Sequence, residues 1–333
     1  MAGLPRVLVT RKLPDAVLAR LARDFDTVFN PNDTLYDAES LIEHSQDCEA
    51  LLICGTDKLT AEVIQRLSTK IRVIATFSVG YEHIDIDAAN ARNIIVTNTP
   101  GVLNAATADL TMMLMLGASR RASEGEAMIR DGRWAGWSPT GMLGTDLTGK
   151  TLGIFGMGEI GRAVATRARG FDMEIHYHNR TQLSPDQEGG AEYHKTADSL
   201  LAVSEVLSLH TPLTSETRHF LSESRIAMLP DNAIVINTAR GDLVVDEDLI
   251  TALKSGKLSA AGLDVFQGEP NIHPEYRSLQ NTFLLPHMGT STVETRNAMG
   301  FCALDNLDAI FADKTPPNLV TIDANQFSED TNY

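Results

Sequence analysis

In the second half of the chain, three side chains lie after predicted strands. Together they could bind and protonate a small keto acid. Arg240 comes after the apolar run 233–238, His287 follows the run 282–285, and Glu269 lies between them in a loop. A guanidinium can pair with a carboxylate through two parallel hydrogen bonds, and an imidazole can protonate a ketone oxygen near neutral pH. A nearby carboxylate would hold that imidazole and favour its charged form. Taken singly, however, each residue type more often forms a surface ion pair, a structural contact or a solvated loop, so spacing alone does not assign this chemistry.

A glycine pattern earlier in the chain indicates a site for a dinucleotide. The pattern is GxGxxG and comprises Gly156, Met157, Gly158, Glu159, Ile160 and Gly161. It follows a predicted strand, 151–155, and opens a predicted helix, 159–170. In that context the first glycine makes a tight turn, the second admits a pyrophosphate and the third lets helix and strand pack closely. The alternative is a glycine-rich turn without a ligand.

The end of the next predicted strand bears on which dinucleotide is bound. An NAD site usually has an acidic residue about 20 residues beyond the glycines, where it accepts from the ribose 2′-hydroxyl. Here the corresponding residues are His178, Asn179, Arg180 and Thr181. Arg180 could pair with a 2′-phosphate, and Asn179 and Thr181 could donate to it. We therefore expect NADP(H) to be preferred, with NAD(H) possible; the alternative is that Arg180 is a solvated loop residue.

These candidate residues belong to an alternation of strands and helices that predicts an α/β fold with two doubly wound parallel sheets. A first series precedes a long apolar helix, 105–120. A second series follows it and ends in a further predicted helix, 293–311. We predict strands at 6–10, 50–54, 71–76, 94–98, 151–155, 173–178, 205–210, 233–238, 260–265 and 282–285. Ligands of such sheets bind beyond the carboxyl ends of the strands. The residues there are His210, Thr211, Pro212, Thr238, Ala239, Arg240, Asp264 and His287.

Composition narrows the classes of function. The 333 residues carry a formal net charge of −16, which argues against nucleic acid and anionic membranes as partners. Three separated cysteines, Cys48, Cys54 and Cys302, predict neither a disulfide framework nor a zinc site, and we expect no bound metal. Neither a signal peptide nor a spanning segment is recognisable, so we expect a cytoplasmic protein with a mobile polar tail at 325–333.

The sequence strongly resembles the D-isomer-specific 2-hydroxyacid dehydrogenases over essentially its whole length. The resemblance lies in residues 77–85, 153–161, 236–241, 262–270 and 285–289. Within that family it is most similar to glyoxylate/hydroxypyruvate reductases. The closer likeness lies in Arg180, Arg120-Arg121 and the segment Trp134-Ala135-Gly136-Trp137.

The resemblance implies a role for each matching residue. Arg240 would bind the substrate carboxylate, His287 would be the acid/base and Glu269 would orient His287. The other substrate contacts implied are the amides of Val79 and Gly80, Thr290, and Trp137 reaching across a dimer; plain interface packing is the alternative for Trp137. Further cofactor contacts implied are Thr107, His210, Thr211, Pro212, Thr238, Ala239, Asp264, His287 and Gly289.

The resemblance also implies a domain organisation with an active-site cleft between domains. A flavodoxin-like substrate-binding domain would comprise residues 1–103 and 293–333, and a Rossmann domain residues 104–292, through which a homodimer would form. The implied activity is the NADPH-dependent reduction of short 2-keto acids, glyoxylate and hydroxypyruvate, to D-2-hydroxy acids. One alternative is an NADH-linked dehydrogenase of broader keto-acid range. Another is a corepressor-like protein that senses the cofactor and keeps the same Arg, Glu and His.

Overall fold

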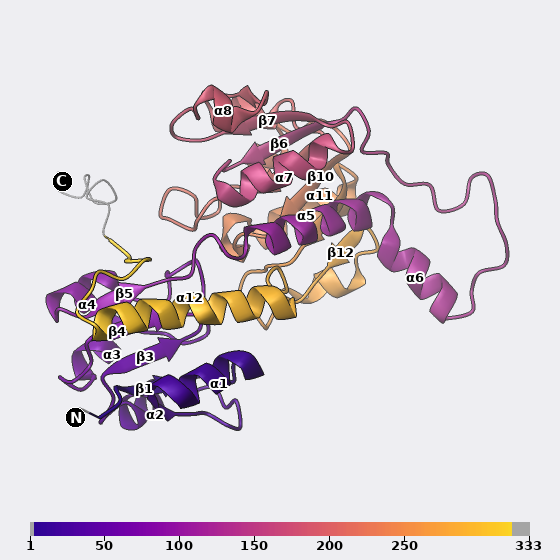
Figure 1. Ribbon diagram of the computed structural model, residues 1–333. Coiled ribbons are helices and arrows are strands. Elements are labelled where there is room, and N and C mark those ends of the chain that lie inside the picture. Colours follow the sequence, from indigo (N-terminus) through magenta and orange to yellow (C-terminus); the bar gives the residue numbers. More distant parts are fainter. Residues whose placement is uncertain (1–2, 322–333) are drawn as a thin grey trace. The chain divides into compact units, whose positions relative to one another are not determined.

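A computed structural model describes residues 3–321 of the chain, which form two compact units (Figure 1). The first unit contains the described residues up to Leu103 and those from Thr292 onward, and the second contains residues 104–291. The polar tail predicted at 325–333 lies outside the described residues. Between residues 3 and 321 no helix is both long and apolar enough to cross a membrane.

The first unit is built on a five-stranded sheet in which every pairing is parallel, with the order β2-β1-β3-β4-β5. Strands β3 and β4 are fully buried along their length, because helices cover a parallel sheet on both faces. The strands are β1 (Arg6–Val9), β2 (Asp26–Val28), β3 (Ala50–Ile53), β4 (Val73–Thr76) and β5 (Ile95–Thr97).

Short polar residues begin most helices of this unit. The side chains of Asp37, Thr60, Asp85 and Thr292 each accept from a backbone amide in the first helical turn. The helices are α1 (Asp15–Asp24), α2 (Ala38–His44), α3 (Ala61–Arg66), α4 (Ile86–Ala91) and α12 (Val293–Phe311). Helix α12, from the far end of the chain, packs on α1 and β4, so this unit is closed by a segment distant in sequence.

The second unit contains a seven-stranded sheet, also parallel in every pairing, with the order β12-β11-β10-β9-β6-β7-β8. Its central strands are apolar and buried, as β10 shows with all five residues covered. The strands are β6 (Thr151–Phe155), β7 (Glu174–His178), β8 (Glu192–Tyr193), β9 (Val206–Leu209), β10 (Ala233–Asn237), β11 (Leu258–Leu263) and β12 (Thr282–Leu284). The two sheets confirm the predicted fold class.

Helix α5 (Asn104–Ser119) lies across the second unit against α7 (Glu159–Arg169) and strands β10 to β12 (Figure 1). Gly262 lets β11 approach α5 closely, since a Cβ at this position would lie 2.8 Å from the carbonyl oxygen of Leu114. The other helices of the unit are α6 (Ala122–Arg130), α8 (Pro185–Glu188), α9 (Ala197–Leu201), α10 (Glu223–Ile226), α11 (Asp246–Ser255) and the 3₁₀ turns η1 (Gly241–Leu243) and η2 (Pro274–Ser278).

Most predicted strands are present with ends shifted by a few residues, and β6 and α12 have the predicted bounds. Two strands were not predicted. Strand β2 has three residues and β8 has two, so neither is long enough to show a hydrophobic pattern. Strand β11 also starts and ends two residues earlier than predicted, which places Asp264 in the loop after the strand rather than within it.

Candidate functional site

The glycine turn after β6 has the geometry of an anion-binding turn. Gly156 has φ +97°, and a Cβ there would lie 2.6 Å from Cγ2 of Thr211 and 2.8 Å from the carbonyl carbon of His210. A Cβ on Gly161 would lie 2.5 Å from the carbonyl oxygen of Gly156, so α7 packs directly on the turn. A Cβ on Gly158 would meet no atom of the described chain within 4 Å, so this glycine leaves space for a ligand.

The start of α7 is available to an anion. Gly158 is the N-cap residue, and no side chain among the described residues caps this helix end. The first amides of a helix point out of its end, where the helix dipole also favours negative charge. Nearby, the hydroxyl oxygen of Thr211 is buried and has no hydrogen-bond partner among the described residues. Open space at Gly158, an uncapped helix end and an unpaired hydroxyl together fit a bound dinucleotide.

The segment after β7 is tied to this turn. Oδ1 of Asn179 accepts from the amide of Met157 over 2.6 Å, and the His178 ring stacks on Phe155 with centroids 5.9 Å apart. The Asn179 oxygen thus braces the glycine turn, and donation from its amide nitrogen to a 2′-phosphate stays a prediction. Arg180 and Thr181 are exposed, and Arg180 has no ion-pair partner within residues 3–321. Arg180 is therefore the group at this strand end that is open to an anionic ligand.

The imidazole of His210, after β9, is not suited to donate a proton. Its Nε2 lies 2.8 Å from Oγ of Ser208, and burial lowers the pKa of His210 to about 4. The ring is therefore neutral near pH 7. The chain continues through Thr211 to Pro212, whose carbonyl accepts from the hydroxyl of Thr217 over 2.8 Å. This strand end thus lines the glycine turn and supplies no acid.

Arg240 is placed by the turn that follows β10. The buried Asn237 accepts from the amide of Ala239 over 3.0 Å and donates to the carbonyl of Arg240 over 2.8 Å. A Cβ on Gly241 would lie 1.9 Å from the carbonyl carbon of Phe266, so only glycine lets this turn meet the segment leading to Glu269. Sequence reasoning identified Arg240 but not Asn237, which shapes the turn.

The hydroxyl of Thr238, in the same turn, lies 3.0 Å from that of Thr111 on α5. The Thr111 hydroxyl in turn donates to the carbonyl of Thr107 over 2.8 Å. Thr107 also borders the loop after β12, since a Cβ on Gly289 would lie 3.6 Å from its methyl group. Helix α5 therefore links the ends of β10 and β12.

Glu269 and His287 form a hydrogen-bonded pair. Nδ1 of His287 donates to Oε2 of Glu269 over 2.7 Å, and Oε1 of Glu269 accepts from the amide of Phe266 over 2.8 Å. Partial burial opposes ionisation of Glu269. Its pKa is nevertheless lowered, by the hydrogen bond and charge of His287, by the Phe266 amide and by the charge of Arg240. The carboxylate is therefore ionised near pH 7, and the outer nitrogen of the imidazole, Nε2, is left for a ligand.

The loop that carries His287 is held by Asp264. Three consecutive backbone amides donate to this residue, each over 2.8 Å. The His287 amide donates to the backbone carbonyl of Asp264. The Met288 and Gly289 amides donate to its carboxylate oxygens, Oδ1 and Oδ2 respectively. These bonds hold His287 at φ +51°, in the left-handed region that residues with a Cβ rarely adopt. Burial raises the pKa of Asp264 despite these donors. In the structure its carboxylate positions the histidine loop, and its contact with the cofactor stays a prediction.

The second unit thus brings together residues from three adjacent strands. Arg240, Glu269 and His287 follow the carboxyl ends of β10, β11 and β12, which are neighbours in the sheet. Thr290 is half-buried in the same loop as His287. A positive group, an ionised carboxylate and an imidazole at one sheet edge can bind a small acid and transfer a proton to or from it.

The other predicted substrate residues lie elsewhere. Val79 and Gly80 belong to the first unit, where their carbonyls accept from the side chains of Asn98 over 2.8 Å and Ser78 over 2.6 Å. Trp137 belongs to the second unit and is 83% exposed, on the long loop after α6. That loop and α6 project from the sheet of their own unit (Figure 1).

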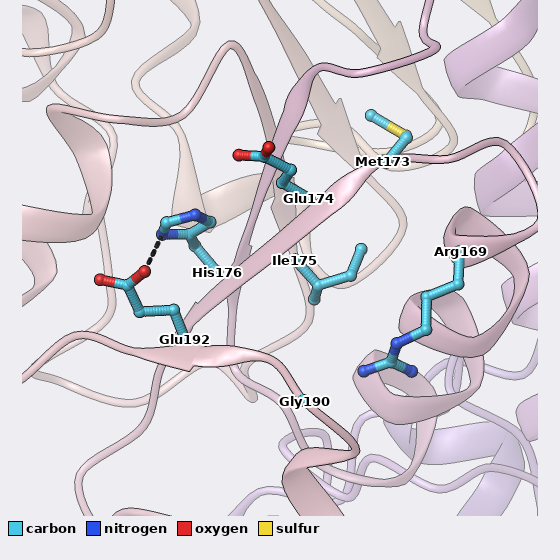
Figure 2. Close-up of a pocket in the computed structure, with 7 residues that line it drawn as sticks. All are labelled: Arg169, Met173, Glu174, Ile175, His176, Gly190 and Glu192. Atoms are coloured by element: carbon cyan, nitrogen blue, oxygen red, sulfur yellow. Dashed lines mark ion pairs between the residues drawn. The ribbon is translucent and has the colours of Figure 1, made fainter.

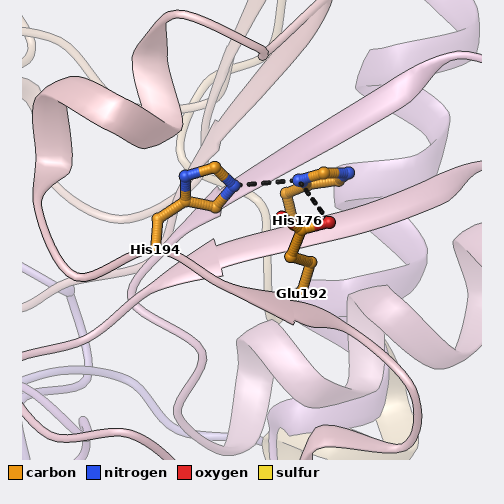
Figure 3. Close-up of side chains that lie close together, drawn as sticks. All are labelled: His176, Glu192 and His194. Atoms are coloured by element: carbon orange, nitrogen blue, oxygen red, sulfur yellow. Dashed lines mark hydrogen bonds and ion pairs between the residues drawn. The ribbon is translucent and has the colours of Figure 1, made fainter.

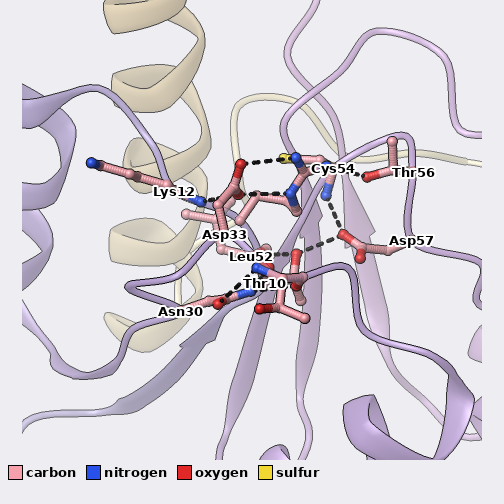
Figure 4. Close-up of polar contacts among 10 residues, drawn as sticks. Thr10, Lys12, Asn30, Asp33, Leu52, Cys54, Thr56 and Asp57 are labelled. Atoms are coloured by element: carbon pink, nitrogen blue, oxygen red, sulfur yellow. Dashed lines mark hydrogen bonds and ion pairs between the residues drawn. The ribbon is translucent and has the colours of Figure 1, made fainter.

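A polar network occupies the carboxyl ends of β1 and β3 in the first unit (Figure 4). The Arg11 guanidinium donates to Asp33 over 2.8 and 3.0 Å and to Thr56 over 2.9 Å, and Asp57 accepts from the Cys54 amide over 2.8 Å. Burial raises the pKa of Cys54 to about 12, so its thiol is not a nucleophile. Sequence reasoning missed Arg11, whose signal is a basic residue directly after a predicted strand.

Comparison with known proteins places these features in a family. Residues 112–289 match the family model described as "D-isomer specific 2-hydroxyacid dehydrogenase, NAD binding domain". The chain is 46% identical to a glycerate dehydrogenase of Hyphomicrobium methylovorum, with 92% of this chain and 96% of that protein covered. It is 42% identical to a glyoxylate reductase of Thermococcus litoralis, with 96% and 97% covered.

A solved structure of an NADPH-dependent glyoxylate/hydroxypyruvate reductase from Sinorhizobium meliloti, in complex with NADP and malonate, superposes with a TM-score of 0.87. That protein is 34% identical, and the match covers 96% of this chain and 97% of the other. The likeness therefore extends over both units and is not limited to the nucleotide-binding motif. The chain belongs to the D-isomer-specific 2-hydroxyacid dehydrogenase family, close to the glyoxylate reductases, and is an NAD(P)-dependent enzyme of that family.

Proposed function

We propose that this enzyme reduces short 2-keto acids, glyoxylate and hydroxypyruvate, to D-2-hydroxy acids and prefers NADPH to NADH. The observation that carries the proposal is the 2.7 Å hydrogen bond between Glu269 and His287 at the sheet edge that also bears Arg240. The names of the relatives support the substrate class, since glyoxylate, hydroxypyruvate and glycerate are short 2-oxo or 2-hydroxy acids.

In this proposal each side chain of the site has one task. The Arg240 guanidinium pairs with the substrate carboxylate through its planar fork of donors. The charged His287 imidazole donates its Nε2 proton to the carbonyl oxygen, because Nδ1 is engaged by Glu269. Negative charge that develops on that oxygen is stabilised by both cations. The reduced nicotinamide supplies the hydride when it is bound.

Other residues bind and orient the reactants. The glycine turn 156–161 and the uncapped start of α7 would receive the pyrophosphate, and Arg180 would pair with the 2′-phosphate. Thr107, Thr211, Thr238 and Ala239 would line the cofactor. The amides of Val79 and Gly80, in the first unit, would bind the substrate carboxylate.

We also propose a homodimer formed through the second unit. Four large apolar side chains of α6 and the loop after it are more than half exposed, namely Ile129, Trp134, Trp137 and Leu143. Large apolar side chains that are exposed on one helix and the loop after it support an interface there, because such side chains gain by being covered. Sedimentation of the full chain tests this, and Trp137→Ala combined with Trp134→Ala should shift the mass from a dimer to a monomer.

The test of the activity is a set of four specificity constants. Oxidation of NADPH and of NADH is followed by absorbance with glyoxylate and with hydroxypyruvate, and bulkier keto acids serve as comparison substrates. We expect the two NADPH pairs to give the highest kcat/KM. Higher values with NADH and bulkier acids would favour the broader dehydrogenase, and binding of NADPH without any turnover would favour a cofactor-sensing protein.

A further inference from the structure

Two histidines and a glutamate meet at the edge of the second unit's sheet (Figure 3). His176 lies on β7 and pairs in register with Glu192 on β8, while His194 follows β8 directly. Side chains alternate along a strand, so Glu192 and His194 share the face on which His176 stands. Their nearest ligand atoms all lie within 4.8 Å of one another. This cluster takes no part in the mechanism described above.

From this geometry we propose that His176, Glu192 and His194 bind one first-row divalent transition metal ion, with Zn²⁺ as the ion tested. Imidazole nitrogen and carboxylate oxygen are ligands that zinc prefers, and two histidines with one glutamate are a recurrent set. The fourth position would be taken by water, because Glu192 has a side chain 69% exposed at the rim of the site.

The distances suit a tetrahedral ion. Nδ1 of His176 lies 2.9 Å from Nε2 of His194 and 3.9 Å from Oε2 of Glu192. Ligand atoms on tetrahedral zinc stand about 3.3 Å apart, given zinc–ligand bonds of about 2.0–2.1 Å. The two nitrogens must therefore separate by a few tenths of an ångström and the carboxylate must approach by somewhat more. The exposed glutamate side chain can make that movement without displacing the strands.

Hydrogen bonds around His194 leave the correct nitrogen free for the ion. The Ser199 hydroxyl donates to the carbonyl of Thr196 over 2.9 Å, so its oxygen is left to accept from Nδ1 of His194, 3.2 Å away. Nε2 of His194 then carries a lone pair, which in the absence of metal accepts the Nδ1 proton of His176. On metal binding Nδ1 of His176 coordinates the ion, and its proton moves by way of solvent to Nε2, so the ring stays neutral and no proton is released overall. No oxidant or further reactant is needed.

The site opens onto a hollow that gives an ion access. His176 and Glu192 line this hollow together with Arg169, Met173, Glu174, Ile175 and Gly190 (Figure 2). In Figure 2 the carboxylate of Glu192 points toward the His176 ring, whereas the Arg169 side chain comes from a helix and is drawn apart from this pair. The Arg169 guanidinium is held by the carbonyl of Glu188, to which it donates over 3.0 Å.

A metal here would fix the two-residue strand β8 to β7. The carbonyl of His194 faces Nδ1 of His178 over 2.8 Å, and the Tyr193 hydroxyl donates to the carbonyl of Asn179 over 3.3 Å. The ligand strand therefore already supports the segment that leads to Arg180. The proposed ion acts as a structural clamp and does not contact the reacting atoms.

Calorimetric titration of the untagged full-length enzyme with ZnCl₂, after removal of metals with EDTA and dialysis, tests the proposal. We expect one equivalent to bind with a micromolar or lower Kd and to raise the unfolding temperature by about 3 °C or more at saturation. Mg²⁺, which requires six oxygen ligands, should not bind. Replacing the ion by Co²⁺ should give the visible absorption of a tetrahedral complex.

Variants decide whether the bound zinc occupies this cluster. His176→Gln, His194→Gln and Glu192→Gln should each raise the Kd at least tenfold, whereas His44→Gln, at an exposed histidine of the first unit, should leave it unchanged. Glu192→Gln alters an exposed side chain, so it remains informative if a histidine variant fails to fold. Absence of saturable zinc binding, or equal binding by wild type and Glu192→Gln, would overturn the proposal.

Discussion

The backbone amide of His287 donates to the carbonyl of Asp264, 2.8 Å away, and the next two amides donate to the carboxylate of the same residue. This arrangement holds His287 in a left-handed backbone conformation and directs its ring to Glu269. A buried aspartate at the end of β11 therefore determines where the candidate acid of β12 stands.

Asp264→Asn should lower kcat for glyoxylate reduction by about 10- to 100-fold, since displacement of a catalytic group by about 1 Å costs on that order. The amide nitrogen of asparagine cannot accept from the second of the two loop amides, so the loop loses one of its bonds. KM for glyoxylate should change little, because Arg240 stands on another strand. Asp246→Asn is the matched control, as Asp246 is also buried in this unit but accepts from Tyr276. A fall in kcat of the same size in both variants would remove the positioning role.

Glu269→Gln should move the alkaline limit of keto-acid reduction to lower pH by about one unit or more. The pKa of Glu269 is lowered, so the side chain is a carboxylate throughout the working range and stabilises the charged form of its partner. Glutamine removes that charge and with it the electrostatic support that the carboxylate gives to a cationic partner. The measurement is kcat/KM against pH, with the exposed Glu216→Gln as control. An unmoved profile would show that Glu269 does not influence the acid.

Arg240→Lys should raise KM for glyoxylate about 10- to 100-fold, because an ammonium group cannot form the two parallel bonds of a guanidinium. Steady-state kinetics at saturating NADPH gives this value. Calorimetry should show that NADPH itself binds as in the wild type. If KM stays within twofold of the wild-type value, Arg240 is not the group that binds the carboxylate.

Arg180→Ala should reduce the ratio of kcat/KM for NADPH to that for NADH by about tenfold or more, since only NADPH carries a 2′-phosphate. Arg180 is exposed and unpaired within residues 3–321, which leaves it free for this contact. Arg277→Ala, at another exposed arginine of the same unit, controls for the loss of one positive charge. A ratio equal to that of the wild type would contradict the 2′-phosphate assignment.

The sequence was most informative where local pattern and chemistry coincide. The strand 151–155, the glycines that follow it and the helix 293–311 have the predicted bounds because each has a strong local signal. The buried parallel strands were likewise predictable from continuous apolar runs.

What the sequence did not reveal depends on contacts between distant residues. Asp264 was predicted to contact a cofactor. Only the fold shows that its carboxylate accepts hydrogen bonds from backbone amides some 25 residues further along the chain. Arg11 and Asn237 are ordinary polar residues until the turns that they hold are seen. The His176 cluster was missed because β8 has two residues and because metal sites were sought among the cysteines.

The most direct test of the central claim is turnover of NADPH by wild type and His287→Ala in the same glyoxylate assay, with His44→Ala as the control histidine. If His287 is the acid, the wild type turns over, kcat falls by about 10²- to 10⁴-fold in His287→Ala, and the control is unchanged. Near-normal kcat in His287→Ala, with the cofactor still bound, would show that the proton comes from another group.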